Sequence, residues 1–184
     1  MSRFFDFIIA FFAIVFISPL LTAVIIFCFF DTGSPIFIQD RVGRNKRVFK
    51  LIKFRTMKID TVSTASHFVS DENITKLGFL LRKTKIDELP QLFNVLCGDM
   101  SLVGPRPNLP NQFELIYERD SLGIYSELPG MTGLAQVQNI DMSTPALLAK
   151  TDKEMIDNFN FNNYFKYIIM TVTGSGSGDA VKPK

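Results

Sequence analysis

The sequence predicts a mixed α/β fold that is mainly helical and begins with a membrane segment. Three observations lead to this fold class: a nearly uncharged apolar run over residues 4–30, two short strand patterns around a basic turn, and several helical patterns after residue 73. The 184 residues suit one domain of ordinary size. We expect a membrane segment over 1–33, a globular domain over 34–173 and a flexible tail over 174–184.

The apolar N-terminal run is long enough to cross a membrane. It carries one charge, Asp6, in its 27 positions, and a straight helix of that length would extend about 40 Å against a hydrocarbon core of about 30 Å. Pro19 interrupts it near the middle, where proline kinks a helix and the Ser18 hydroxyl can bond the freed carbonyl. Each arm alone is too short to span. A kinked spanning helix and a re-entrant hairpin that enters and leaves by one face both stay open.

The charges that flank this run are positive at both ends. Arg3 precedes it and a basic block follows closely, which is compatible with both ends on the cytoplasmic side under the positive-inside rule. The run is longer than the apolar core of a signal peptide, and no small-residue cleavage site follows it. We therefore expect the segment to be retained and the chain to lie at the cytoplasmic face.

Residues 41–58 form a basic block that contains no acid: Arg41, Arg44, Lys46, Arg47, Lys50, Lys53, Arg55 and Lys58. The remainder of the chain is acidic, so the basicity is local and argues against a general nucleic-acid binder. The block falls on a predicted hairpin with strands at 36–39 and 48–54. We expect it to attract anionic lipid headgroups, at about 1 kcal/mol per basic residue, and to bind phosphate through Lys53 and Arg55.

The segment 84–96 predicts a helix, because its apolar residues recur at helical spacing: Ile86, Leu89, Phe93 and Leu96. Pro90 is tolerated only in the first turn. Asp87 and Glu88 therefore lie at or next to a helix N-terminus, where free N–H groups and the helix dipole favour anions. Such a place suits a phosphate and an ionised carboxylate nucleophile. The alternative is that Asp87 only caps the helix and Glu88 is a solvated first-turn acid.

Two further stretches carry candidate ligand-binding residues. Arg106 stands between two prolines, which restrict its backbone, and its guanidinium suits bidentate phosphate recognition; the alternative is a surface arginine on a tight turn. The turn 129–133 contains glycines that allow close approach to a ligand. His67 lies in a polar loop over 60–73 without a partner motif, which favours a solvated side chain.

The rest of the chain predicts ordinary elements. Helices are expected over 74–83, with Arg82 in its last turn, and over the three segments 110–120, 144–158 and 161–172; a short strand is expected over 134–137. The aromatic segment 161–172 suits either the core or an interfacial helix at the headgroup level. Cys28 and Cys97 do not indicate a disulfide framework, which suits a reducing compartment.

Four stretches, taken together and in this order, resemble the bacterial sugar transferases, the small monotopic PglC-like phosphoglycosyl transferases: KFRTM at 53–57, IDELPQLFNV at 86–95, GDMSLVGPRP at 98–107 and PGMTGLAQV at 129–137. The resemblance runs from about Arg3 to about Tyr167. It implies a re-entrant membrane helix broken at Ser18 and Pro19, in a monotopic protein of the bacterial inner membrane. One departure is Leu128, where many relatives have arginine, and it leaves one nucleotide contact in doubt.

The resemblance also implies a reaction. A sugar 1-phosphate passes from a UDP-sugar to polyprenyl (undecaprenyl) phosphate with release of UMP, in the first membrane step of glycoconjugate assembly, with Mg²⁺ as cofactor. Asp87 is implied as the covalent nucleophile and Glu88 as a residue that binds the metal or manages protons. The implied phosphate-binding residues are Lys53, Arg82 and Arg106, and the turn near the nucleotide holds Pro129, Gly130, Thr132 and Gly133.

Two other functions stay open at this point. One is a non-catalytic membrane module that docks on anionic lipid and recruits a partner, and the other is a metal-dependent hydrolase of nucleotide-sugars. Docking needs neither the adjacent carboxylates nor the proline-flanked arginine, so these residues favour the transferase. The sugar, the glycan, the prenol length and a homo-oligomeric state are left open.

Overall fold

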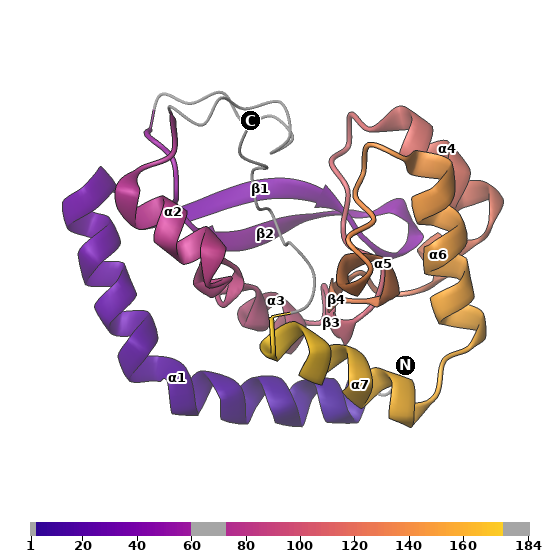
Figure 1. Ribbon diagram of the computed structural model, residues 1–184, viewed down its shortest axis with the longest axis horizontal. Coiled ribbons are helices and arrows are strands. Elements are labelled where there is room, and N and C mark those ends of the chain that lie inside the picture. Colours follow the sequence, from indigo (N-terminus) through magenta and orange to yellow (C-terminus); the bar gives the residue numbers. More distant parts are fainter. Residues whose placement is uncertain (1–2, 60–72, 175–184) are drawn as a thin grey trace.

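A long bent helix runs along one side of the molecule and carries the remaining elements on its concave side (Figure 1). The computed structural model describes residues 3–59 and 73–174, so the predictions for His67 and for the tail beyond residue 174 lie outside the described residues. The elements, in chain order, are α1 (Arg3–Thr32), β1 (Ile36–Val42), η1 (Arg44–Lys46), β2 (Val48–Phe54), α2 (Lys76–Lys83), η4 (Ile86–Glu88), α3 (Gln91–Cys97), β3 (Ser101–Val103), α4 (Phe113–Ser121), η5 (Ile124–Ser126), β4 (Gly130–Thr132), α5 (Leu134–Val137), α6 (Pro145–Asp157) and α7 (Phe161–Val172). The predicted mixed, mainly helical fold is confirmed.

Helix α1 is continuous but bends sharply near its middle (Figure 1). Pro19 lies inside the helix, and its missing N–H leaves the carbonyl of Val15 without its helical partner. The Ser18 hydroxyl donates to that same carbonyl oxygen at 2.9 Å. The predicted kink and the predicted role of Ser18 are confirmed, and the bend gives α1 two arms at an angle.

The charge inside α1 fastens this helix to the rest of the molecule. The Asp6 carboxylate is fully buried and accepts hydrogen bonds from the hydroxyl of Ser101, the backbone N–H of Leu102 and the hydroxyl of Tyr164. Ser101 and Leu102 belong to β3, and Tyr164 belongs to α7. A carboxylate inside an apolar helix is therefore compensated by the domain that packs on it.

Much of α1 nevertheless faces outward with apolar side chains. The exposed ones include Phe4, Phe7, Phe11, Phe12, Phe16, Ile26, Phe27, Phe29 and Phe30. By length and composition α1 could cross a membrane, and most of its apolar window lies outside the protein core. An apolar surface of this extent indicates a membrane-associated segment.

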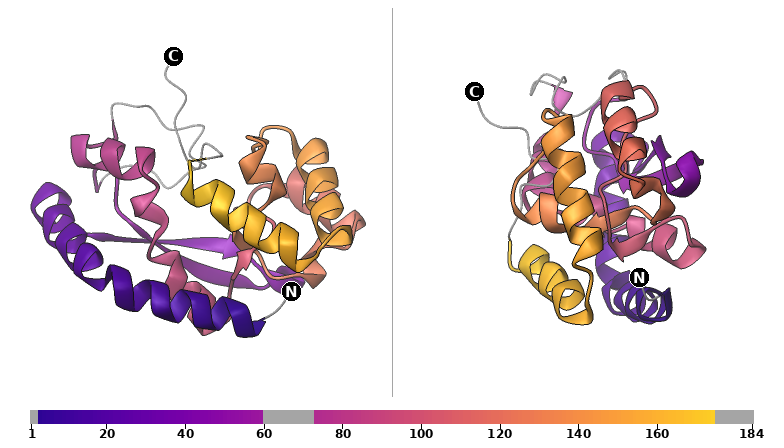
Figure 2. Two further views of the ribbon diagram at one scale, coloured as in Figure 1. Left: turned by 60° about the horizontal axis from the view of Figure 1, so that its bottom comes forward. Right: turned by 90° about the vertical axis from the view of Figure 1, so that its right-hand side faces the viewer.

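Helix α7 lies beside the first arm of α1 (Figures 1 and 2), with the ring of Phe161 5.4 Å from that of Phe5. Tyr164 and Tyr167 are buried, whereas Phe161, Phe165, Ile169 and Val172 are exposed. One face of α7 is thus part of the core, and its apolar outer face continues the exposed surface of α1. The structure supports the core interpretation of this segment directly.

Two separate pairs of strands complete the fold. Strands β1 and β2 form the predicted antiparallel hairpin, with Ile36 opposite Phe54 and Val42 opposite Val48. Strands β3 and β4 form a parallel pair that the sequence did not predict. The strand predicted over 134–137 is wrong, since these residues form α5. A four-residue run with three apolar residues does not distinguish strand from helix, and the long-range pairing with β3 selects 130–132 instead.

Candidate active site

The two adjacent carboxylates lie in a turn of their own. The single helix predicted over 84–96 is wrong at its beginning: Lys85 has a left-handed backbone (φ 57°), η4 follows, and α3 begins only after Pro90. Asp87 and Glu88 are nonetheless next to a helix N-terminus, as predicted. Both are buried and neither is the capping residue of α3, which is Pro90. The alternative of a plain cap and a solvated acid is therefore wrong.

Arg106 reaches this turn from the loop that follows β3. Its Nη2 atom donates to Oε1 of Glu88 at 2.6 Å, and both side chains are largely buried. A short, partly desolvated ion pair of this kind is stronger than a surface pair. Arg106 is therefore not a surface arginine, and the structure joins two predicted site residues that are 18 positions apart in the chain.

Lys85 is a member of the site that the sequence analysis missed. Burial lowers the pKa of the Lys85 ammonium, while nearby Glu88 raises that pKa and nearby Arg106 lowers it. Lys85 directly precedes η4, the turn that holds Asp87 and Glu88. Its left-handed backbone is uncommon for a residue with a side chain and is typical of functional sites. In the sequence, a lysine two positions before Asp87 was the only signal, and its orientation depends on that backbone.

Arg82 and Lys53 come from elements that contact the η4 turn. Both α2 and β2 pack against η4. The Arg82 Nε donates to the Thr56 hydroxyl at 2.9 Å, whereas its Nη1 is buried and has no hydrogen-bond partner among the described residues. Lys53 is buried on β2. An unsatisfied buried guanidinium nitrogen is unusual and suits a site for an anionic ligand.

Helix α2 is placed by a close backbone contact. A Cβ atom on Gly78 would lie 2.1 Å from the carbonyl oxygen of Thr56, so only glycine permits α2 to pack this closely on the segment that follows β2. The same segment supplies the Thr56 hydroxyl that holds Arg82. Thr56 is a second residue that the sequence analysis did not select.

Arg55 has a different environment from the one predicted for it. Its guanidinium donates to the backbone carbonyls of Ser34 and Ile36 and lies over the ring of Phe37. These contacts fasten the chain where it leaves α1, and they do not support the predicted phosphate role.

The basic block as a whole is not one surface. Arg41 is buried and donates to the Pro107 carbonyl, whereas Lys46 and Lys50 pair with Asp120 and Asp40. The predicted contact with anionic headgroups therefore cannot involve the block as a unit.

The glycines of the 129–133 turn have a packing role that the sequence did not indicate. Strand β4 pairs with β3, and a Cβ on Gly130 would lie 2.0 Å from the backbone nitrogen of Gly104. A Cβ on Gly133 would lie 2.6 Å from the Gly104 carbonyl oxygen. These glycines hold the loop that carries Arg106. Thr132 is buried on the same strand, and proximity of Pro129 and its neighbours to a nucleotide stays a prediction.

The described residues contain no group of three or more histidine, cysteine or acidic side chains that could hold a metal. Asp87 and Glu88 offer up to two carboxylates. Mg²⁺ commonly takes one or two carboxylates and completes its shell with substrate phosphates and water. The donor set therefore fits Mg²⁺ bound together with a phosphorylated substrate, and does not fit an all-protein metal cage.

Comparison with known proteins identifies the family of this chain. The family model of the bacterial sugar transferases matches residues 1–176. Three relatives are a "Galactosyl transferase CpsE" of Streptococcus agalactiae (38% identical, 77% of this chain and 34% of the relative), an "Uncharacterized sugar transferase EpsL" of Bacillus subtilis (36%, 94% and 85%), and a "Putative undecaprenyl-phosphate N-acetylgalactosaminyl 1-phosphate transferase" of Bacillus subtilis (43%, 59% and 57%). The chain spans about a third of the first of these. The chain belongs to the bacterial sugar transferase family.

Proposed function

We propose that this chain is a phosphoglycosyl transferase that moves a sugar 1-phosphate from a UDP-sugar to polyprenyl phosphate and releases UMP. The observation that carries the proposal is the buried pair Asp87 and Glu88 with Arg106 bound to Glu88 at 2.6 Å. Relatives named as undecaprenyl-phosphate sugar phosphotransferases support the general reaction. The UDP-sugar donor and the covalent intermediate are part of the proposal, and they rest on what the family resemblance implies.

The reaction divides into two displacements at one phosphorus atom. In the first, a carboxylate oxygen of Asp87 attacks the phosphorus that bears the sugar, the P–O bond to UMP breaks, and UMP leaves with the bridging oxygen. In the second, an oxygen of polyprenyl phosphate attacks the same phosphorus and frees Asp87, which gives the polyprenyl diphosphate sugar. A carboxylate nucleophile avoids a single meeting of two strongly anionic substrates.

The cations around the turn would compensate the charge at the transferring phosphate. Arg106 and Arg82 present guanidinium donors, and Lys53 and Lys85 add ammonium charge from β2 and from the left-handed turn. Preorganised donors of this kind stabilise developing charge without reorganising during the reaction. Mg²⁺, when bound at Asp87 or Glu88 with a substrate phosphate, would neutralise further charge at the phosphoryl oxygens.

The bent helix suits a site where a soluble nucleotide meets a membrane lipid. The apolar surface of α1 and the outer face of α7 would enter the bilayer from one side, and the Pro19 bend supports the re-entrant arrangement over a straight span. We place the site at the cytoplasmic face of the bacterial inner membrane, where nucleotide-sugars are available. Exposed arginines of the hairpin turn, Arg44 and Arg47, are the candidates for anionic headgroups.

The test is UMP release by the full chain in detergent micelles or nanodiscs. Release should require a UDP-sugar, undecaprenyl phosphate and Mg²⁺ together for multiple turnovers, and Asp87→Asn should abolish it. Asp120→Asn is the matched control, because Asp120 is an exposed carboxylate paired with Lys46. Salt-sensitive vesicle binding without UMP release from any UDP-sugar would favour a docking module, and turnover without the lipid acceptor would favour a hydrolase.

A further inference from the structure

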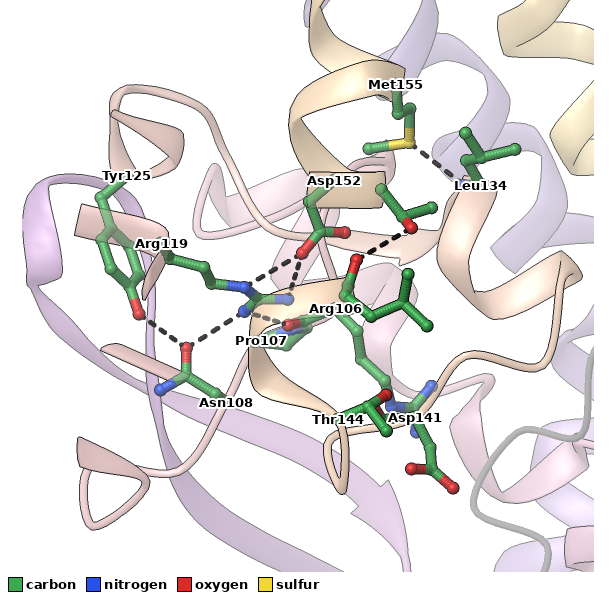
Figure 3. Close-up of polar contacts among 12 residues, drawn as sticks. Arg106, Pro107, Asn108, Arg119, Tyr125, Leu134, Asp141, Thr144, Asp152 and Met155 are labelled. Carbon is green, nitrogen blue, oxygen red and sulfur yellow. Dashed lines mark hydrogen bonds and ion pairs between the residues drawn. The ribbon is translucent and has the colours of Figure 1, made fainter. Parts of the chain in front are cut away.

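Four buried polar side chains form one hydrogen-bonded network behind the loop that carries Arg106 (Figure 3). They are Arg119 of α4, Asp152 of α6, Asn108 and Tyr125. We propose that this network, centred on the ion pair of Arg119 and Asp152, positions Arg106 for phosphate binding. The inference rests on the function proposed above, in which the Arg106 side chain acts on the transferring phosphate.

The guanidinium of Arg119 is the centre of the network. Its Nε and Nη2 atoms donate to the same oxygen of Asp152 at 3.0 and 2.6 Å. Its Nη1 donates to the backbone carbonyl oxygen of Arg106 at 2.8 Å and to Oδ1 of Asn108 at 3.1 Å. The Tyr125 hydroxyl donates to the same Asn108 oxygen at 2.9 Å. One planar side chain therefore joins α4 and α6 to the Arg106 backbone.

The network reaches the proposed site through Arg106 itself. Pro105 and Pro107 flank this residue and limit its backbone freedom, so the position of its carbonyl largely determines where its side chain begins. That side chain ends on Glu88, beside Asp87. A shift of the Arg106 carbonyl would be passed to the guanidinium that contacts Glu88.

Stability alone is a poor explanation for this arrangement. Arg119 and Asp152 are each about 1% exposed, and a buried ion pair is often no more stabilising than well-packed apolar residues of similar volume. The particular gain from arginine here is geometric, because its rigid fork serves a carboxylate and a backbone carbonyl at once. A lysine at this position would keep the charge but could not reproduce the fork.

The first test compares Arg119→Lys with the unaltered full chain in nanodiscs, with UMP release as the assay. We expect kcat to fall about 10- to 100-fold, the scale of a misplaced catalytic group, with a much smaller change in the KM for the UDP-sugar. Lys153→Ala is the matched control, because it breaks an exposed ion pair with Asp157 on α6, the helix that carries Asp152. Its kcat should stay within about twofold of the unaltered value. A kcat for Arg119→Lys equal to that of the control would overturn the proposal.

A second test separates positioning from stability. If Arg119 acts through Arg106, then adding Arg119→Lys to an Arg106→Lys chain should change kcat by less than about twofold, because the two effects are coupled. If the two losses multiply, Arg119 does not act through Arg106 and the proposal fails. The double variant Arg119→Leu, Asp152→Leu should have a Tm close to that of the unaltered chain and a kcat as low as that of Arg119→Lys. Recovery of both would also overturn it, whereas an unaltered chain without any UMP release would refute the proposed function itself.

Discussion

The attachment of the membrane helix depends on Asp6, and Asp6→Ala is the substitution that tests it. The variant removes the acceptor of three donors, namely Ser101, Leu102 and the Tyr164 hydroxyl. Asp6 and Ser101 are fully buried and Tyr164 is about 1% exposed, so water does not replace the lost carboxylate easily. Three buried donors would be left unsatisfied.

The expected cost follows from these contacts. An unsatisfied buried donor costs roughly 1–3 kcal/mol, and the three share one acceptor, so their effects are coupled and do not simply add. We expect a loss of about 3–4 kcal/mol for Asp6→Ala, within the range of large single-site effects. At roughly 2–4 °C per kcal/mol for a chain of this size, the Tm should fall by about 6–16 °C.

The assay is thermal unfolding of the detergent-solubilised chain, followed by helical circular dichroism because the chain has no tryptophan. Asp6→Asn is the control, since its amide oxygen can still accept from the same donors, and its loss should be less than half that of Asp6→Ala. Equal Tm values for Asp6→Ala and the unaltered chain would show that this carboxylate does not fasten α1 to the domain.

Three further predictions concern the bend, Arg55 and alkaline pH. Pro19→Ala restores a donor to the Val15 carbonyl and removes the cost of proline inside a helix, which is about 3 kcal/mol. We expect an N-terminal tag to move from the cytoplasmic to the periplasmic side in a protease-accessibility assay, and an unmoved tag would contradict the role given to the bend. Arg55→Ala should lower the Tm by about 2–8 °C because the contacts with Ser34 and Ile36 are lost, while kcat stays within about threefold. A loss of kcat without a change in Tm would instead support the phosphate-binding role first expected for Arg55. Burial raises the pKa of Tyr164, with the Asp6 hydrogen bond adding to it, and burial also raises the pKa of Tyr125 and Tyr167. As the pH rises, the unfolded chain therefore loses its phenolic protons before the folded chain does. In urea titrations at stepped pH, these groups should leave the free energy of unfolding unchanged below pH 10.0 and lower it above that pH.

Local patterns were sufficient for the parts of the fold with strong periodicity or a special residue. The hairpin, the helices near 76–83, 113–121, 145–157 and 161–172, and the bend at Pro19 all agree with the sequence analysis. The parallel pair of β3 and β4 could not be predicted in the same way, because each strand has three residues and exists only through its distant partner. The strand expected over 134–137 is helix α5 for another reason: four residues, three of them apolar, are too few to show a period.

The site shows a similar division. Asp87, Glu88 and Arg106 were selected from the sequence, and the structure joins the latter two in one ion pair. Lys85 was missed because the direction of its side chain depends on a left-handed backbone, which no residue pattern predicts.

The contacts behind the site were equally hidden from the sequence. The buried Arg119 and Asp152 are 33 positions apart, and each alone is typical of a charged residue on the polar face of an amphipathic helix. Arg55 was assigned to phosphate from its place in a basic block, whereas its real contacts are backbone carbonyls that only the tertiary fold brings near.

The most direct measurement of the proposed nucleophile uses the donor without the lipid acceptor. When the full chain is mixed with an accepted UDP-sugar and Mg²⁺, it should convert about one equivalent of the donor per protein to UMP in a burst, and UMP formation should then stop. Mass spectrometry of the digested protein should place one sugar phosphate on the peptide that contains Asp87. A burst with the modification on another residue, or acceptor-dependent turnover with no burst and no modified peptide, would contradict Asp87 as the covalent nucleophile.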